Sequence, residues 1–553
     1  MLYSTRSYNK CKNMRHFANV ALKENETASN RCHETQLKRV TMPGATTTTK
    51  TTTTTASTVK AKKYDDIPGP KGIFGIGTFY HYFPVFGKYN FDEVHKSGLD
   101  KYAKYGDIVK ERMLPGVDII WLFDPNDIAK VLNNSGPDMY PQRKSHLGLI
   151  KYRKDRPHIY KHAGLLPTNG PEWWRLRSEF QKGLSSPSHI RQFLCDSDSI
   201  TKEFIAQVEP TKTTDAELVE DFLPELSRLN LELVCYLSFD VRMESFSDKE
   251  RHPQSRSTRL IQAAEDANSC LIPLDQGVPI WHYIETPIYR KFRLSQEYLE
   301  SVAVDLVSQK ISFFDENSIA QKTGKRSLLD DYLLNPRLDL ADVVGMACDL
   351  LLTGIDTTTY STCFLLYHIA RNPHVQERVF QEAFNALPDY DTDEITEEKM
   401  AHQLTYSKAV LKETFRLNPV SVGVGRTSNT DLILSGYNVP KGTIIVTQNY
   451  ISCRLAKNFE SPLKFVPERW LKSADGKSLK STVNPYLVLP FSHGMRSCIA
   501  RRFAEQNMLV LMLRIIRKYE IGWMGVDHMD VKTTTTINKP DHPVKLTFKK
   551  RSI

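Results

Sequence analysis

The stretch Phe491-Ser-His-Gly494-Met-Arg496-Ser-Cys498-Ile-Ala500 places one cysteine in a short segment with a glycine and an arginine. Gly494 allows a backbone conformation that other residues adopt only with strain, which predicts a tight loop before the cysteine. The chain has nine cysteines, and a buried thiol is an ordinary core residue. The combination of all three residue types instead favours a thiolate with a function.

A thiolate in such a loop is suited to bind iron. It gives electron density to a haem iron and favours cleavage of an O–O bond, while backbone N–H groups near the sulfur tune its charge. Arg496 stands where a charge-assisted hydrogen bond to a haem propionate is expected. Phe491 is expected to pack beneath the macrocycle.

A second signal lies at Glu413-Thr-Phe-Arg416, in a predicted helix from Tyr406 to Leu417 that Asn418-Pro419 ends. Residues three apart share a helix face, but an exposed pair contributes only about 0.2–0.5 kcal/mol. Taken alone, the motif is therefore weak evidence for a functional site. The segment Phe465-Val-Pro-Glu-Arg469-Trp470 offers a second arginine for the same glutamate.

A third signal is Leu351-Leu-Thr-Gly354-Ile-Asp356-Thr357-Thr358, inside an apolar segment from about Asp339 to Asn372. A helix of that length extends roughly 50 Å and crosses a large domain. Glycine and β-branched threonines lower helix stability, by about 1 kcal/mol for the glycine. Residues that lower helix stability in the middle of a long helix are typical of a functional site.

A fourth signal is Gly170-Pro-Glu-Trp173-Trp-Arg-Leu-Arg177, which predicts a helix start with proline in its first turn. Trp173 and Arg177 share one face. On these residues alone, an amphipathic surface helix with a buried tryptophan is the plain interpretation. Arg426, in Val424-Gly-Arg-Thr, follows the helix of Glu413.

Together these stretches resemble the cytochrome P-450 family, whose haem-binding signature is Phe-x-x-Gly-x-Arg-x-Cys-x-Gly. Ala500 replaces the last glycine. The resemblance implies a mainly α fold with a minor β region, in a single large haem-binding domain. It also implies haem b with an axial thiolate, and Cys498 as the metal ligand.

The resemblance extends to individual roles. It makes Asp356 and Thr357 the catalytic pair that relays protons and contacts O2, with Gly354 making room for O2 against the helix. Thr353 replaces a smaller residue that is common in the family. The implied haem-binding residues are Trp173, Arg177, Arg426, Phe491, Arg496 and Cys498. Glu413, Arg416 and Arg469 are the implied structural network under the haem.

The net charge of +10 is concentrated at the start of the chain. Residues 1–63 carry twelve lysines and arginines against three glutamates, so the remaining residues are nearly neutral. A nucleic-acid partner therefore has little support. The leader has no apolar run long enough to span a membrane and resembles a mitochondrial transit peptide, a disordered cytosolic tail being the alternative.

The domain boundaries follow from composition. Residues 1–63 are predicted to be transit peptide and low-complexity spacer, including the threonine-rich run 46–55, and residues 64–553 to be the monooxygenase domain. The cysteines include no C-x-x-C pair, which fits a reducing matrix. Residues 432–446 alternate around turn residues and predict a β-hairpin.

No convincing dinucleotide-binding motif is present, so electrons must come from a partner. Lys408 and Lys412 share a helix face, which is ordinary for solvated lysines. Mitochondrial members of the family resemble the chain here and dock an acidic [2Fe-2S] ferredoxin, reduced by NADPH-ferredoxin reductase, through such lysines. Arg501 and Arg502 add positive charge beside Cys498.

Further stretches, among them Gly164–Arg175 and Asn484–Arg496, resemble arthropod mitochondrial ecdysteroid 22-hydroxylases. The resemblance implies hydroxylation of a steroid, the ketodiol precursor of ecdysone, at carbon 22, and peripheral contact with the matrix side of the inner mitochondrial membrane. Expected substrate-lining segments are residues 345–355, 420–424 and 534–537. Alternatives are another steroid position, foreign compounds, a haem-thiolate isomerase or dehydratase, and a non-catalytic binding protein.

Overall fold

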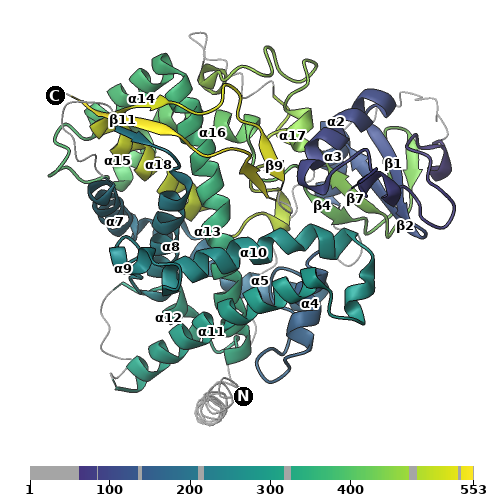
Figure 1. The fold of residues 1–553 in the computed structure, drawn as a ribbon, viewed down its shortest axis with the longest axis horizontal. Coiled ribbons are helices and arrows are strands. Elements are labelled where there is room, and N and C mark those ends of the chain that lie inside the picture. The colour runs from purple at the N-terminus through teal and green to yellow at the C-terminus, as the bar shows by residue number, and fades with distance from the viewer. Residues whose placement is uncertain are drawn as a thin grey trace, which may run out of the picture.

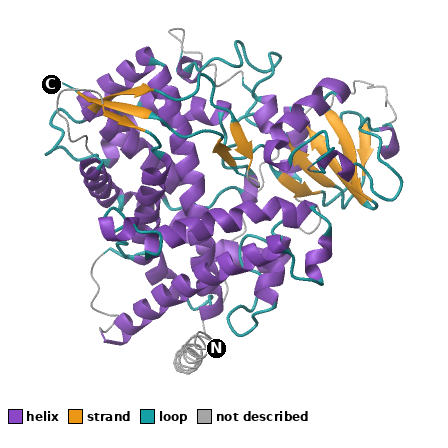
Figure 2. Cartoon of the chain, in the orientation of Figure 1, coloured by secondary structure: helices purple, strands orange, loops and turns teal. Residues whose placement is uncertain are grey.

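A computed structural model describes residues 61–83, 85–134, 140–208, 217–316, 325–472, 483–533 and 537–551. The predicted transit peptide and its threonine-rich run lie outside these residues, apart from residues 61–63. Helices make up most of the described chain and the strands form a minor part (Figure 2). The predicted fold class, mainly α with a minor β region, is confirmed.

Many of the α-helices lie around one long helix, α13 (Figure 1). In chain order they are α2 (Val94–Tyr105), α3 (Pro125–Asn133), α4 (Leu147–Lys154), α5 (Gly170–Leu184), α6 (Pro187–Arg191), α7 (Leu194–Gln207), α8 (Leu223–Phe239), α9 (Asp248–Arg251), α10 (Arg256–Gln276), α11 (Pro287–Glu316), α12 (Leu328–Leu333), α13 (Leu340–Arg371), α14 (Pro373–Ala386), α15 (Glu397–His402), α16 (Thr405–Leu417), α17 (Asn449–Ser452) and α18 (Arg501–Lys518).

Short 3-10 helices join these elements. They are η1 (Tyr64–Asp66), η2 (Phe79–Tyr82), η3 (Phe91–Glu93), η4 (Pro279–His282), η6 (Pro467–Trp470) and η8 (Gly494–Arg496). Two of them matter for the site, because η6 carries Arg469 and η8 carries Arg496.

Helix α13 has 32 residues and matches the long helix predicted from the sequence. It begins with a reciprocal cap, in which the Asp339 carboxylate accepts from the Asp342 N–H and the Asp342 carboxylate accepts from the Asp339 N–H. It ends before Pro373, which begins α14. Since α8, α10, α11 and α16 all pack against it, α13 forms the centre of the helical core.

The described strands form four small sheets. They are β1 (Ile108–Leu114), β2 (Val117–Leu122), β3 (Glu217–Val219), β4 (Gly425–Thr427), β5 (Leu432–Leu434), β6 (Tyr437–Val439), β7 (Ile444–Thr447), β8 (Tyr519–Trp523), β9 (Val531–Thr533), β10 (Asn538–Pro540) and β11 (Leu546–Lys550). The largest sheet has the order β1-β2-β7-β4, and the others are β3-β11-β8, β5-β6 and β9-β10.

The hairpin predicted for residues 432–446 is correct in its first half only. Strands β5 and β6 pair antiparallel around Ser435 and Gly436, which both have positive φ. Strand β7 instead pairs parallel with β2 and antiparallel with β4. The apolar residues 444–446 therefore belong to a sheet that also contains β1 and β2, which come from a distant part of the chain.

Within the described residues, no helix is both long and apolar enough to cross a membrane.

Candidate haem-binding and oxygen-activating site

Cys498 lies in a loop between η8 and α18. Gly494 has φ +75°, a conformation that favours glycine, and the Ser497 N–H donates to the Gly494 carbonyl at 3.0 Å. The Cys498 N–H donates to the Phe491 carbonyl at 2.8 Å, which closes the loop. The Phe491 ring packs edge-on against Phe415 of α16, with centroids 5.3 Å apart.

The Cys498 side chain is both deep in the protein and accessible. Burial raises its pKa, and the Ala500 backbone N–H and the Arg177 and Arg501 guanidinium groups oppose that increase. The residue is nevertheless exposed. A side chain with both properties faces an internal cavity rather than the outer surface.

Four arginines lie close together near this cysteine. Burial, together with repulsion from Arg143, Arg426 and Arg177, lowers the pKa of Arg496 to about 8. Burial also lowers the pKa of Arg426 to about 10. Two guanidinium nitrogens of Arg496 are buried and have no hydrogen-bond partner among the described residues. Buried cations with unused donors are suited to bind an anionic group.

Arg143 belongs to this cluster although the sequence analysis did not select it. Burial lowers its pKa to about 10, and its Nε donates to the Leu166 carbonyl at 2.9 Å. An isolated β-bridge between Gln142 and Thr427 brings it beside Arg426. No local motif marks Arg143, because the contact joins segments almost 300 positions apart in the chain.

Helix α5 presents Trp173 and Arg177 to the same region. Both side chains are buried, and the Arg496 guanidinium lies over the Trp173 ring, 4.6 Å from its centroid. The Arg177 Nε donates to Gln181 at 3.2 Å, one turn further along the helix. The structure thus brings these two residues together with Arg496.

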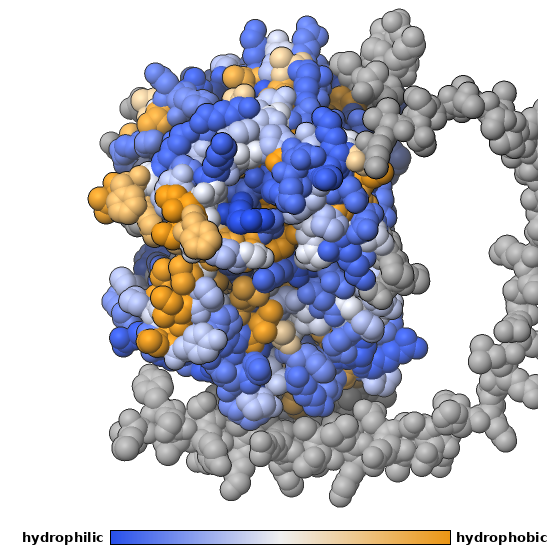
Figure 3. All heavy atoms as spheres, turned by 90° about the vertical axis from the view of Figure 1, so that its right-hand side faces the viewer, coloured by the Kyte–Doolittle hydropathy of each residue, from blue (hydrophilic) through white to orange (hydrophobic). Residues whose placement is uncertain are grey.

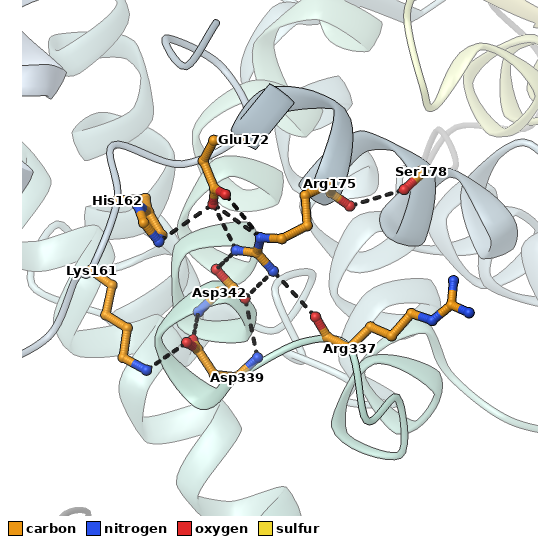
Figure 4. Close-up of polar contacts among 8 residues, drawn as sticks. All are labelled: Lys161, His162, Glu172, Arg175, Ser178, Arg337, Asp339 and Asp342. Atoms are coloured by element: carbon orange, nitrogen blue, oxygen red, sulfur yellow. Dashed lines mark hydrogen bonds and ion pairs between the residues drawn. The ribbon is translucent and has the colours of Figure 1, made fainter. Parts of the chain in front are cut away.

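A polar network on a different face of α5 fixes this helix against the start of α13 (Figure 4). Arg175 donates to both Asp342 carboxylate oxygens at 2.9 Å and to the Arg337 carbonyl at 3.2 Å. Glu172 and Asp342 raise the pKa of Arg175 through these hydrogen bonds. The network fixes the position and rotation of α5 against α13, and Trp173 and Arg177 face inward.

Glu413, Arg416 and Arg469 form a buried hydrogen-bond network. Arg416 binds the Glu413 carboxylate through two nitrogens at 2.8 and 2.9 Å, and Arg469 binds it at 3.0 Å. The Val466 N–H and the Trp470 indole complete the shell at 3.0 and 2.9 Å. The network ties α16 to η6 and to the loops between them.

The catalytic candidates on α13 point in different directions. The Thr357 hydroxyl donates to the Thr353 carbonyl at 2.8 Å, and both threonines are partly open. Asp356 is buried and accepts from Asn268 of α10 at 2.8 Å. An added Cβ on Gly354 would come within 2.9 Å of Val234 of α8, so this glycine has a packing reason beside the predicted role in O2 access.

The two lysines proposed for docking differ in surroundings. Lys408 is exposed, and its ammonium donates to the Ala401 carbonyl at 3.0 Å. It lines a surface hollow of about 180 Å³ together with Arg502 and Arg191. Lys412 is half-buried, with its ammonium 3.9 Å from the Trp470 ring centroid.

Asn538, which directly follows the expected substrate-lining segment 534–537, contacts the start of another expected segment, 420–424. Its N–H donates to the Val420 carbonyl at 2.7 Å, and its side chain donates to the adjacent Pro419 carbonyl at 2.8 Å. Residues 534–536 lie outside the described residues. Residues 345–355 belong to the central part of α13.

The family model for cytochrome P450 matches residues 75–548. The chain belongs to the cytochrome P450 family. It is therefore a haem-thiolate monooxygenase, and its cofactor is haem b, as the sequence analysis predicted. This cytochrome P450 is 52% identical to cytochrome P450 302a1, mitochondrial, of Drosophila melanogaster, over 89% of this chain and 96% of that protein.

Other relatives are more distant. Probable cytochrome P450 301a1, mitochondrial, of Drosophila melanogaster is 29% identical over 88% of this chain and 87% of its own length. Ecdysone 20-monooxygenase of the same fly is 28% identical over 83% of this chain and 84% of its own length. The mitochondrial relatives support a mitochondrial location.

The observed residues fit this cofactor. Cys498 supplies an accessible sulfur inside the protein, and Arg496 of the arginine cluster supplies two buried donors that have no hydrogen-bond partner in the described part of the chain and suit propionate oxygens. When bound, the haem provides the activation of O2. The Cys498 loop would orient the thiolate and the arginine cluster would hold the propionates, while α13 carries the titratable groups.

Proposed function

We propose that this cytochrome P450 hydroxylates an ecdysteroid precursor, the ketodiol, at carbon 22. The observation that carries the substrate is the resemblance to arthropod ecdysteroid 22-hydroxylases in separate stretches of the chain, together with 52% identity to cytochrome P450 302a1 over most of its length. A relative named for action on ecdysone is compatible with a steroid substrate.

The individual residues have the following proposed roles. Cys498 would hold the haem iron through its thiolate, and Trp173, Arg177, Arg426 and Arg496 would hold the propionates. Phe491 would contact the ring. Asp356 and Thr357 deliver protons during O2 activation, since one is a buried acid and the other a hydroxyl on the partly open face of the same helix. The Glu413 network supports the loops around η6.

Electrons are proposed to come from a [2Fe-2S] ferredoxin, which NADPH-ferredoxin reductase reduces. Lys408, Lys412, Arg501 and Arg502 place positive charge at the side of α16 and α18. Opposite charge on an acidic partner would increase its association rate and fix its orientation there. The hollow beside Lys408 lies in the same surface.

A peripheral contact with the matrix side of the inner mitochondrial membrane is the further part of this proposal. Two segments, in the ranges 73–86 and 278–288, carry exposed apolar side chains. Apolar surface gathers on the face that Figure 3 shows. The side chains are Ile73, Phe74, Ile76, Val85, Phe86, Val278, Ile280, Tyr283, Ile284 and Ile288. Such a patch is typical of a protein or membrane contact.

Residues 1–63 are proposed to be the transit peptide and spacer that precede this domain. The charge excess of that segment is the supporting observation.

The test is reconstitution of the haem-loaded protein with NADPH, ferredoxin reductase and ferredoxin. The ketodiol is supplied and the products are identified by mass spectrometry. An NADPH-dependent alcohol at carbon 22 is the expected result. A steroid alcohol at another carbon would contradict the position, and an intact haem-thiolate enzyme that makes no product would contradict the substrate.

A further inference from the structure

The amide of Asn268 connects α10 to the buried acid of α13. Its Nδ2 donates to Asp356 Oδ2 at 2.8 Å and to the Leu352 carbonyl at 3.1 Å. The Asn268 side chain is buried, and Leu352 stands one helical turn before Asp356. Both amide hydrogens are therefore used across one helix interface, which fixes the direction of the Asp356 carboxylate.

A charged pair lies at the solvent edge of this contact. Glu265, three residues before Asn268 on α10, forms an ion pair with Lys539 of β10. The two side chains are 34% and 27% exposed, so the pair is in contact with water. The Lys539 ammonium also lies 5.9 Å from the ring centroid of Tyr360, one turn after Asp356.

The groups around Asp356 shift its pKa in opposite directions. The pKa of Asp356 is raised to about 7 as the net result of four effects: burial raises it most, the Asn268 hydrogen bond lowers it, Glu265 raises it and Lys539 lowers it. Burial raises the pKa of Tyr360 well above its usual value, and Asp356 and Glu265 add to this increase, so the phenol stays neutral. Near neutral pH the Asp356 carboxyl therefore exists in both protonation states, as a proton carrier requires.

The Asp356 carboxylate and the groups that contact it lie on a different face of α13 from Thr357. The Thr357 hydroxyl belongs to the partly open face of α13 and donates to Thr353, whereas Asp356 is directed toward α10. A proton that Asp356 carries is consequently supplied from the α10 side of the helix.

We propose that Asn268 is a positioning residue that holds Asp356 toward α10, and that the Glu265–Lys539 pair forms the solvent end of its proton supply, between α10 and β10. The inference rests on the proposed proton-delivery role of Asp356. It adds three residues, Asn268, Glu265 and Lys539, which no sequence motif selected.

The matched variants Glu265→Gln and Lys539→Gln separate this role from a structural one. Both remove the same ion pair, so a merely structural effect would be the same in each. Their electrostatic effects are opposite, because the lost anion had raised the pKa of Asp356 and the lost cation had lowered it. Asn268→Leu removes a donor to the carboxylate and is expected to raise this pKa.

The first measurement is an infrared titration of the ferric holoenzyme without substrate. The carboxyl band is assigned to Asp356 by its loss in Asp356→Asn. The midpoint should shift by about half a pH unit or more, downward in Glu265→Gln and upward in Lys539→Gln and Asn268→Leu. Equal shifts in the two glutamine variants, or none, would overturn the inference.

The second measurement is the pH dependence of coupling, as product and peroxide formed per NADPH. Coupling should fall as pH rises through the Asp356 midpoint, and each variant should move this fall in the direction of its infrared shift. A fall that stays fixed while the infrared midpoint moves would overturn the proton-supply role. Failure of the proposed substrate would appear separately, because wild-type protein would then form no product while its infrared titration remained measurable.

Discussion

Thr357 and Asp356 are consecutive in the sequence, but their side chains leave α13 in different directions. The threonine hydroxyl bonds the carbonyl one turn earlier, and the acid bonds Asn268. The two residues therefore have separate tasks in the proposed mechanism. The hydroxyl contributes on the open face, and the acid exchanges protons on the α10 side.

Replacing Thr357 by alanine should uncouple electron use from product formation. Loss of a positioned proton donor should lower product per NADPH by about an order of magnitude or more and release peroxide. Both quantities are measured in the reconstituted system. Thr362→Ala is the matched control, since its buried hydroxyl makes the same bond to the carbonyl four residues earlier. Equal coupling in the two variants would contradict the role of Thr357.

Glu413 is surrounded by donors and fully buried, so its charge matters for stability. Glu413→Gln leaves two guanidinium groups without their anion and should lower the free energy of unfolding by about 3–5 kcal/mol. Chemical denaturation measures this loss. Asp155→Asn is the control, because its pair with Lys151 is exposed and should contribute about 0–1 kcal/mol. Similar losses in the two variants would show that the network is unimportant.

Residue types alone could not predict the whole site. The loop composition selected Cys498 and Arg496, and the family resemblance selected Trp173 and Arg177, whose spacing alone fits an ordinary surface helix. Arg143 and Asn268 could not be selected in this way. Their partners, Arg426 and Asp356, come from distant segments, and their neighbours show no distinctive pattern.

At the scale of elements, α16 joins the buried network on one side to a basic surface on the other. Glu413 and Arg416 face inward, and Lys408 is exposed. The helix therefore has a structural face and a face available to a partner. Lys412 lies between them, over the Trp470 ring.

Charge reversal on α16 should weaken ferredoxin binding. Lys408→Glu combined with Lys412→Glu should raise the dissociation constant by about tenfold or more at low salt, and less at high salt because exposed charges are screened. Titration at two ionic strengths measures this. Arg290→Glu with Lys291→Glu on α11 changes net charge equally and should have little effect. Identical weakening by both pairs would indicate a nonspecific charge effect.

Elements with strong periodicity or caps were predictable, and pairings between distant strands were not. The α13 helix was evident from its apolar composition and from Pro373. Strand β7 was not, since an alternating segment after a hairpin predicts a continuation of that hairpin. Its real partners, β2 and β4, are fixed by the tertiary fold.

At the scale of the whole molecule, apolar surface gathers on the face that Figure 3 shows, and the segments 73–86 and 278–288 carry exposed apolar side chains. Phe74→Ser combined with Ile284→Ser should reduce partition to cardiolipin-containing vesicles by about tenfold or more, since each removes an exposed apolar side chain. Vesicle sedimentation measures this. Leu463→Ser, which removes an exposed leucine elsewhere, should bind as wild type does. Unchanged partition of the double variant would contradict the membrane contact.

The cavity-facing sulfur of Cys498 is the feature on which the assignment depends. The most direct measurement is the absorption spectrum of the reduced, carbon-monoxide-bound protein, recorded for the wild type and for Cys498→Ala. The wild type should show the red-shifted band of a thiolate-ligated haem, and Cys498→Ala should lack both this band and oxygenation. A Cys498→Ala protein that kept the thiolate band and full activity would contradict the account.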